Sequence, residues 1–552
     1  MRTAFLILPA LLACAAFVSA GGAKEGGTAA AAVTAPGELP VVKEKVTLTG
    51  FIPSVGFIED LRTNASAQWL ERATGVHIEW LETTKADAKN KLGVLLASGD
   101  YPDILSGTGA NGAGLSTQDI YRYGTQGVFL ALNDLVDAYG YHLKELFRKE
   151  PVVRPAITSP NGRIYGLPAV FTDDYHMTLR QKLWINKAWL DGLGLKMPTN
   201  TDEFYAVARA FKEKDPNGNG LKDEIPLTGA KRSQEDLALW IMNAFVAAGG
   251  PDDSGDALLN NYEFLVNDKL FFDADKPEFR DGLRYIARLY REGLIDVAAL
   301  TQDKEQIKPL VDGGAVNRIG AVASHHPGNF ANTADPKERY KEFVAQIPIK
   351  GPRGNRSTAW IIDQVIQPGQ LEITDKCRQP AVAMRWADNF FSVEFGLREK
   401  GVEGRHWAKV DAGENLISFS GQPALYKYLK VLTKEDNAQI NLGPGWTRNL
   451  KNEFAKGAGY SYEEMLYNQT TFYEPFKVRR FPYATASLKE ASMTEFNDLR
   501  RTIHTFIAES TDRFLIGDKD IETQWDAYVA QLKQIGLDRY LSILQETLTS
   551  SR

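Results

Sequence analysis

Cysteine is almost absent from this chain of 552 residues, which contains only Cys14 and Cys377. Cys14 lies in an apolar N-terminal segment that we expect to be an export signal, so the mature chain keeps a single thiol. One thiol excludes an internal disulfide. The fold must therefore be stabilised by buried apolar area, and the hydrophobic residues, 43% of the chain, suffice for more than one domain.

The chain also lacks an excess of basic residues. It has 64 Lys and Arg against 70 Asp and Glu, and this balance argues against a nucleic-acid partner, which requires a basic patch. After the N-terminus, no apolar run approaches the ~18 residues that a transmembrane helix needs. The motifs G-x-S-x-G and H-E-x-x-H are missing, as is a zinc-type cluster, and we predict that the protein is not an enzyme.

The first 20 residues have the features of a secretory signal peptide. The segment from Ala4 to Val18 is apolar, and Val18-Ser19-Ala20 is a small-residue cleavage site. We therefore expect an exported protein, in the periplasm or at the outer face of the membrane. Cleavage before a lipidated Cys14 is the alternative. Residues 21–40 are rich in Gly, Ala and Thr and predict a flexible leader.

Alternating strand and helix patterns predict a parallel α/β sheet in the first part of the chain. Period-2 alternation at residues 46–49 and 76–80 indicates strands, and the stretch 65–73 between them has helical spacing. A second helix at 86–98 leads to a short strand at 103–105. Right-handed crossovers would make these strands parallel.

Longer helices follow and indicate a more helical second part. Helices are predicted over residues 200–214, 279–291, 380–395 and 525–535, because apolar side chains recur there at helical spacing. No internal repeat is present. The predicted fold class is α/β with two lobes, of which the second is larger and helix-rich.

One loop has the ligand spacing of a calcium site. Side-chain oxygens at positions 1, 3, 5 and 9, a backbone carbonyl at 7 and a glycine at 6 match the start of a calcium-binding loop. Position 12, usually a bidentate Glu, is Pro226, so the second helix of an EF-hand is missing. A solvated Asn-Gly turn is the alternative. The predicted ligands of a structural Ca²⁺ are Asp215, Asn217, Asn219, the carbonyl of Leu221, Asp223 and, as the replacement carboxylate, Glu224.

Short motifs spread over most of the mature chain resemble the large extracellular solute-binding proteins of ABC importers. More narrowly, they resemble the LplA-type group, which includes alginate-oligosaccharide binders. The order and spacing of the motifs carry the resemblance, since each one alone is weak. The motifs are Leu96-Ala97-Ser98-Gly99-Asp100-Tyr101-Pro102-Asp103, Gly162-Arg163-Ile164-Tyr165-Gly166-Leu167-Pro168, Leu183-Trp184-Ile185-Asn186-Lys187-Ala188-Trp189-Leu190, Gly401-Val402-Glu403-Gly404 and the tail from Trp525 to Leu537.

The resemblance implies two lobes joined by a hinge of crossing segments, with an oligosaccharide bound between them. In alginate-binding relatives the matching loop holds calcium, which implies that role for the six ligands named above. The expected partners are ABC transporter permease subunits, and the expected state is a monomer. Members of the group are usually lipoproteins, which leaves a lipid anchor at Cys14 as an alternative here.

The expected lobe 1 comprises residues 41–165 with a return at about 305–365, and the expected lobe 2 comprises 166–304 and 366–552.

An exported hydrolase or lyase is a competing hypothesis, and a glycosidase would need two carboxylates about 5 to 9.5 Å apart. A binding protein that serves a membrane sensor is another alternative. A peptide or another polar solute as ligand also stays open.

Candidate ligand-binding residues lie where sheet ends and loops would present polar and aromatic side chains to a sugar. The loop after 103–105 contains a formal G-x-G-x-x-G, but no acid with ribose-binding spacing follows, which disfavours a dinucleotide. Two adjacent histidines raise a metal alternative, yet sequence neighbours point apart and no third ligand is evident. For the tryptophans, a core position is the alternative. The predicted residues are Ser106, Thr108, Asn111, Asp173, Tyr175, His176, Trp240, His325, Asn329, Trp360 and Trp446.

Overall fold

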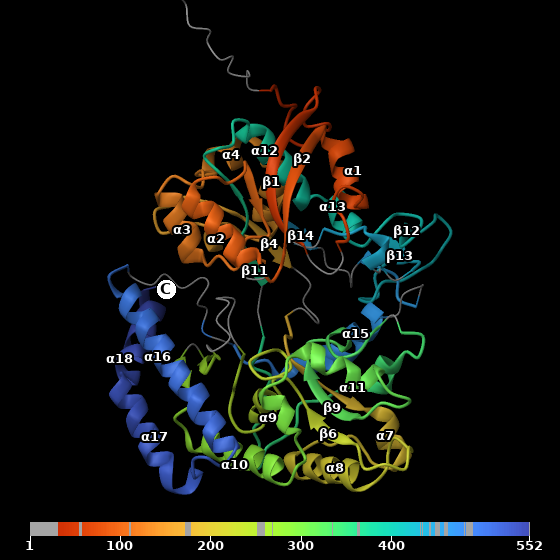
Figure 1. The fold of residues 1–552 in the computed structure, drawn as a ribbon, viewed down its shortest axis with the longest axis vertical. Helices are drawn as coiled ribbons and strands as arrows, with labels where there is room; N and C mark the ends of the chain where they lie inside the picture. The colour runs from red at the N-terminus through yellow and green to blue at the C-terminus, as the bar shows by residue number, and fades with distance from the viewer. Residues whose placement is uncertain are drawn as a thin grey trace, which may run out of the picture.

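The computed structural model describes most of the chain and places it in two lobes, one above the other in Figure 1. Within the described ranges, no helix combines the length and apolar composition of a membrane span. These ranges are residues 31–54, 58–109, 112–171, 178–250, 260–267, 269–333, 335–361, 365–430, 432, 434–440, 443–447, 453–457, 462–479, 481 and 490–550.

The first lobe contains a six-stranded mixed sheet. β1 pairs in parallel with β2 and β3, which confirms the predicted parallel arrangement. β14 pairs in parallel with β4, and β11 lies antiparallel between β3 and β4. In order across the sheet, the strands are β14 (Gly445–Thr447), β4 (Leu167–Phe171), β11 (Val365–Ile373), β3 (Ile104–Ser106), β1 (Val46–Ser54) and β2 (Val76–Thr84).

Helices pack around this sheet and begin and end at recognisable residues. The Asn64 side chain accepts hydrogen bonds from the Ser66 and Ala67 amides at the start of α1, and Gly75, with a φ of 74°, ends it. The helices of the first lobe are α1 (Ala65–Thr74), α2 (Ala88–Ser98), α3 (Thr117–Thr125), α4 (Asn133–Tyr139), α5 (Tyr141–Lys149), α6 (Val153–Ala156), α12 (Pro380–Asp388) and α13 (Val393–Arg398).

The helix predicted over 380–395 is divided into α12 and α13. The Asn389 side chain donates to the Arg385 carbonyl, 2.8 Å away, and the Ser392 hydroxyl accepts from the Phe395 amide at 3.1 Å. Ser392 therefore starts a new helix, because an N-cap serine satisfies an amide that the first turn leaves without a partner.

The second lobe contains a four-stranded sheet and most of the long helices. β5 is antiparallel to its neighbours β10 and β9, and β6 is parallel to β9. Across the sheet the strands are β10 (Phe343–Gln346), β5 (Lys182–Asn186), β9 (Ile319–Ser324) and β6 (Ile225–Thr228). The helices are α7 (Lys187–Gly192), α8 (Thr201–Glu213), α9 (Leu237–Met242), α10 (Pro277–Arg291), α11 (Lys308–Asp312), α15 (Tyr462–Thr470), α16 (Glu490–Leu515), α17 (Ile521–Ile535) and α18 (Leu537–Ser550).

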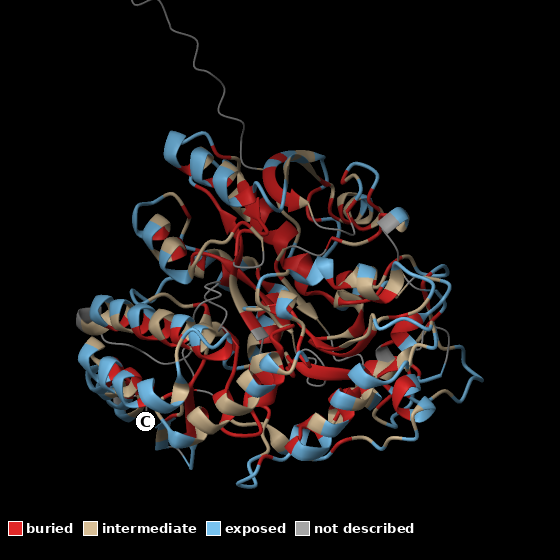
Figure 2. Cartoon of the chain, turned by 60° about the horizontal axis from the view of Figure 1, so that its bottom comes forward, coloured by how far each residue is buried: buried red, intermediate tan, exposed pale blue. Residues whose placement is uncertain are grey.

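Two hairpins extend the lobes. β7 (Glu263–Val266) pairs with β8 (Lys269–Phe272), and β12 (Trp407–Lys409) pairs with β13 (Tyr426–Tyr428). Each lobe buries its own apolar core, and Figure 2 shows the buried strands inside and the exposed helix faces outside. The largest core combines the second sheet with α10 and the C-terminal helices α16 to α18, as expected for a helix-rich second lobe.

Two segments lie in the lobe opposite to the one expected from the sequence. β9 and β10, within the segment 305–365, pair with β5 in the second sheet. β11 and α12, which follow residue 365, belong to the first lobe. The physical reason is that all six residues of β9 are buried, so its apolar run suits the centre of either sheet, and pairing between distant strands decides which.

The predicted flexible leader, residues 21–40, is attached to the first lobe from Ala31 onward. Val33 forms an isolated antiparallel bridge with Val42. One amino group of Arg385, a side chain that is 1% exposed, donates to the Ala35 carbonyl at 2.9 Å and to the Glu38 carbonyl at 2.6 Å. The arginine thus holds residues that composition alone assigned to a linker.

Replacing this arginine tests the attachment. We expect Arg385→Met to accelerate amide hydrogen exchange in residues 33–42 and to cost about 1 kcal/mol of unfolding free energy, because two carbonyls lose a charged donor. Arg72→Met, an exposed position on α1, is the matched control. Unchanged exchange in residues 33–42 would contradict the role assigned to Arg385.

Candidate functional site

The topology brings one end of each sheet to face the other lobe. The chain leaves β4 through residues 172–181 to reach β5, and leaves β10 through residues 347–364 to reach β11. The carboxyl end of β4 and the parallel ends of β1, β2 and β3 therefore lie at the crossing side of the first sheet. In the second sheet, Lys182 pairs with Ser324, so β5 begins where β9 and β6 end. We call these the facing strand ends, and ligands of open α/β sheets bind beyond such ends.

On the first-lobe side, the glycine-rich loop after β3 is closed by its own amides. The Ala113 amide donates to the Gly107 carbonyl at 2.9 Å, and the Leu115 amide donates to the Thr108 carbonyl at 2.9 Å. A Cβ on Gly112 would lie 1.8 Å from the Gly107 carbonyl oxygen, so this turn requires glycine. Amides that are used internally cannot cradle a phosphate, and this observation also disfavours the dinucleotide alternative.

Thr108 fixes this loop to β11. Its hydroxyl oxygen lies 3.0 Å from the Gly369 carbonyl and 2.5 Å from Glu372 Oε2. A hydroxyl has one proton to donate, so both contacts are satisfied when Glu372 is protonated and donates to Thr108. Burial raises the pKa of Glu372 to about 8, which keeps the carboxyl group neutral. The predicted ligand residues Ser106 and Thr108 are thus buried supports of the loop, and Asn111 lies outside the described residues.

On the second-lobe side, a buried carboxylate organises the end of β9. Glu235, 1% exposed, accepts hydrogen bonds from the Ser324 hydroxyl and the Asn329 side chain, both at 2.9 Å. Asn329 therefore lies at the facing strand ends, where a residue that the sequence did not single out positions it, and its role in ligand binding stays a prediction. The sequence signal for Glu235 was weak, since an acid six residues after a glycine resembles an ordinary turn.

The two adjacent histidines do not form a metal site with each other. Nδ1 of His326 lies 2.9 Å from the Tyr462 hydroxyl. The imidazole rings of His325 and His326 are inclined at 62° to each other, with centroids 5.2 Å apart. Burial, followed by the charges of Lys182, Lys304 and Lys308, lowers the pKa of His326 to about 3. His326 is therefore neutral at physiological pH, and His325 is a buried neighbour at the same strand end.

The three predicted tryptophans differ in position. Trp240 and Trp360 are 5% and 6% exposed and belong to the large core of the second lobe, where Trp240 packs against Phe204 at 5.8 Å. Trp240 and Trp360 therefore occupy core positions, which was the alternative to a ligand-binding role. Trp446 is partly buried on β14, and the Lys149 ammonium lies 5.2 Å from its ring. Asp173, Tyr175 and His176 lie outside the described residues, and their role stays a prediction.

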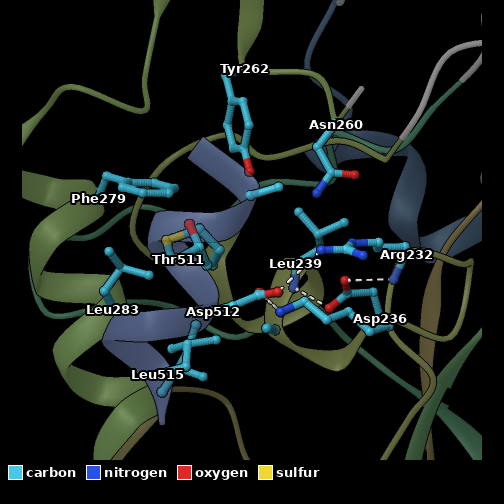
Figure 3. A pocket seen from close by; sticks show the side chains of 15 residues that line it. Arg232, Asp236, Leu239, Asn260, Tyr262, Phe279, Leu283, Thr511, Asp512 and Leu515 are labelled. Carbon is cyan, nitrogen blue, oxygen red and sulfur yellow. Dashed lines mark hydrogen bonds and ion pairs between the residues drawn. The ribbon is translucent and has the colours of Figure 1, made fainter. Parts of the chain in front are cut away.

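Two cavities lie in the second lobe. The first, shown in Figure 3, has a volume of about 30 Å³ and lies among α9, α10 and α16. Arg232 and Asp236 lie at one side of it and Phe279 and Leu283 at the other. It is too small for a sugar. The second, about 340 Å³, is bordered by the first turn of α8 and by α10 from Glu278 to Arg288. At this cavity Arg353 pairs with Glu278 and with Asp281.

The loop for which calcium is predicted, residues 215–224, is held by hydrogen bonds among its own residues. Asp215 accepts from the Asn219 amide at 3.1 Å and from the Gly220 amide at 2.8 Å, which curls the chain around the first carboxylate. The side-chain amides of Asn217 and Asn219 both donate to Asp223 Oδ1, at 3.2 and 3.0 Å. Across the residues that the structure describes, no three His, Cys, Asp or Glu side chains converge to hold a metal ion.

Together, two lobes joined by crossing segments and polar residues at the facing strand ends define a two-lobed binding protein. The family model of the bacterial extracellular solute-binding proteins matches residues 57–395, and the chain belongs to this family. The predicted resemblance to such proteins of ABC importers is confirmed. The chain is accordingly a solute-binding protein and not an enzyme, and the family is one of exported proteins.

Individual relatives are distant. The chain is 25% identical over 502 residues to the fructooligosaccharide ABC transporter substrate-binding protein FusA of Streptococcus pneumoniae, covering 87% of this chain and 85% of that one. Among solved structures, FusA in complex with kestose has a TM-score of 0.70 at 22% identity, with 91% of this chain and 99% of that chain covered. A related FusA structure is that of an EF-hand mutant.

Two further solved structures share the fold. A solute-binding protein of Bifidobacterium longum infantis, described as HMO-binding and associated with an ABC transporter, has a TM-score of 0.73 at 20% identity, with 91% and 98% covered. The alginate-binding protein AlgQ2, solved without calcium ion, has a TM-score of 0.65 at 22% identity, with 92% and 99% covered. At these identities the likeness establishes the two-lobed fold.

The buried carboxyl group of Glu372 predicts a pH dependence of stability. Its pKa is about 8 in the folded protein against an ordinary 4.5, so between these values the folded chain keeps a proton that the unfolded chain releases. The free energy of unfolding should therefore fall as pH rises from about 4.5 to about 8, by an amount on the order of 4 kcal/mol. We expect Glu372→Gln to remove this part of the slope in urea unfolding at several pH values. Glu79→Gln, an exposed position on β2, is the control, and equal slopes for wild type and Glu372→Gln would contradict a neutral Glu372.

Proposed function

We propose that the protein captures an oligosaccharide between its two lobes outside the membrane and delivers it to the permease of an ABC importer. The observation that carries the proposal is the arrangement of the facing strand ends, since ligands of open α/β sheets bind beyond such ends and here both sheets direct them toward the other lobe. Family membership supports it, as do the substrates in the names of relatives, which include fructooligosaccharides and polygalacturonan.

The crossing segments supply a hinge in this proposal. Near the second lobe, backbone hydrogen bonds join these segments to one another and to the chain at Phe476. The Arg180 amide donates to the Trp360 carbonyl at 3.0 Å, and the Thr358 amide donates to the Phe476 carbonyl at 2.7 Å. These bonds fasten three separate segments of the chain to the second lobe. Such a hinge allows the lobes to close over a ligand.

A thermal-shift panel tests the capture of saccharides. A ligand at ~100 times its dissociation constant stabilises the folded state by ~2.7 kcal/mol, so we expect a raised melting temperature with one class among kestose, oligogalacturonates, alginate oligomers and a control peptide. Small-angle scattering of the same mixtures should show a decreased radius of gyration as the lobes close. A shift with the peptide alone would contradict a saccharide ligand, and consumption of the saccharide would contradict a binding role.

We also propose that the loop 215–224 holds a structural Ca²⁺. Glu224 is the residue with the clearest need for a cation, because its Oε1 is buried and has no hydrogen-bond partner among the described residues. Burial, followed by the charges of Asp215 and Asp223, raises the pKa of Glu224. A bound Ca²⁺ would neutralise these three carboxylates. The side-chain amides of Asn217 and Asn219 would have to rotate, so that their oxygens replace the N–H groups now directed at Asp223.

Calcium removal tests this site. We expect the chelator EGTA to lower the melting temperature of the wild type, and Asp215→Asn or Asp223→Asn to lower it in the presence of calcium and to make the chelator ineffective. The affinity for saccharide at saturating calcium should change little, since the loop lies at the far ends of α8 and β6 from the crossing segments. Asp526→Asn, an exposed position on α17, is the control. A wild-type melting temperature that EGTA leaves unmoved would overturn the calcium proposal.

A further inference from the structure

The chain crosses between the lobes a third time, from β14 of the first sheet to α15 of the second lobe. Part of this crossing, residues 453–457, is built into the hairpin of β12 and β13, because the Ala455 amide donates to the Tyr426 carbonyl at 2.8 Å. We call residues 399–430, 434–440 and 453–457 the hairpin module. In Figure 1 it lies beside the level at which the lobes meet, with the first lobe above it and α15 below it.

A small aromatic core makes the hairpin module a unit of its own. Trp407, which is fully buried, packs with Tyr428 and Phe454, and the rings of Tyr428 and Phe454 are stacked with centroids 4.3 Å apart. The indole nitrogen of Trp407 donates to the Gly401 carbonyl at 2.9 Å. Because Phe454 belongs to the third crossing, this core joins the crossing to the hairpin.

Asn437 fixes the hairpin module to the first lobe. Its side chain, 7% exposed, accepts a hydrogen bond from the Glu59 amide at 3.0 Å and donates to the Asp60 carbonyl at 2.8 Å. Its own carbonyl accepts from the Ala65 amide, at the start of α1, at 2.9 Å. Glu59 and Asp60 follow the carboxyl end of β1, so the module holds a loop at the facing strand ends.

The other side of the hairpin module contacts α15 of the second lobe. Phe419, 8% exposed, lies against Tyr467 of α15, with ring centroids 5.9 Å apart and ring planes inclined at 34°. Beside this contact, the Gly457 amide donates to the Glu464 side chain at 2.6 Å. Separating the two rings would expose apolar surface to water, so the contact resists a change in the relative position of the lobes.

The helix α15 in turn supports the second-lobe side of the facing strand ends. The Tyr462 hydroxyl accepts a hydrogen bond from the Gly328 amide at 3.0 Å and lies 2.9 Å from Nδ1 of His326. The Gln469 side chain accepts from the Ala345 amide of β10 at 3.0 Å. A continuous line of contacts therefore runs from the loop after β1, through the hairpin module and α15, to the turn after β9.

We propose that the hairpin module is a strut between the lobes, which restricts them to a narrow range of orientations through the contact of Phe419 with Tyr467. The two crossing segments restrain the lobes at one place, and a second contact to the side of them leaves only rotation about the axis through both. Lobes that sample fewer orientations lose less conformational entropy when a ligand holds them closed. This consequence for affinity rests on the proposed function, whereas the strut itself does not.

Distances between the lobes, measured in the whole mature chain without ligand, test the strut. Spin labels are attached at Glu79→Cys on β2 and Lys337→Cys in the second lobe, both exposed positions. The native Cys377 is 7% exposed and burial raises the pKa of its thiol to about 11, so it should not react with the label. Double electron–electron resonance then gives the distribution of distances between the two labels.

We expect Phe419→Ala and Tyr467→Ala each to broaden this distribution by about twofold, because the lobes gain orientations that the ring contact excludes. The double variant should be no broader than either single variant, since both changes remove the same contact. Leu425→Ala, at a position of the hairpin module that is 53% exposed, is the matched control and should leave the distribution as in the wild type.

The outcomes separate the strut from the proposed function. A distribution in Phe419→Ala and Tyr467→Ala as narrow as in the wild type would overturn the strut. Should the alanine variants fail to fold, Phe419→Leu keeps the apolar side chain without the ring contact, and a narrow distribution in that variant would overturn the strut equally. For a saccharide that binds the wild type, the variants should bind on the order of threefold to tenfold more weakly, and unchanged affinity would overturn the link to closure. If no saccharide binds, the proposed function fails, and the distances still decide the strut.

Discussion

The arrangement of this protein depends on the antiparallel pairing of β11 between β3 and β4. This strand returns the chain from the second lobe and completes the first sheet, so it joins segments that are more than 190 residues apart in sequence. The same strand carries Glu372, which is bonded to Thr108 in the loop after β3. Removing the pairing would open the first sheet in the middle and detach a loop at the facing strand ends.

Near the facing strand ends, buried polar groups are paired with partners in their own lobe. The contacts of Glu235 with Ser324 and Asn329 are an example. Such pairing matters because a buried polar group without a partner costs more free energy than its hydrogen bond contributes.

Much of the local structure could be predicted from the sequence because its causes are local. The Asn64 and Asn200 caps, the stop at Gly75 and the parallel strands at 46–54 and 76–84 follow from short-range hydrogen bonding and alternation. The loop 215–224 was recognisable for the same reason, as its ligand pattern lies within ten residues. The prediction failed at 380–395, where one serine cap divides a helix, and at the leader, where a buried arginine 350 residues away supplies the attachment.

By itself, the sequence determined the α/β class, the family and the spacing of a cation loop, since these depend on composition, periodicity and residues that are close in the chain. Only the tertiary structure decided which sheet received β9 and β11, and whether Trp240 and Trp360 joined the core. The physical reason is that strand pairing and charge proximity involve residues hundreds of positions apart, and many pairings have similar local preferences. The sum of the buried contacts selects one of them.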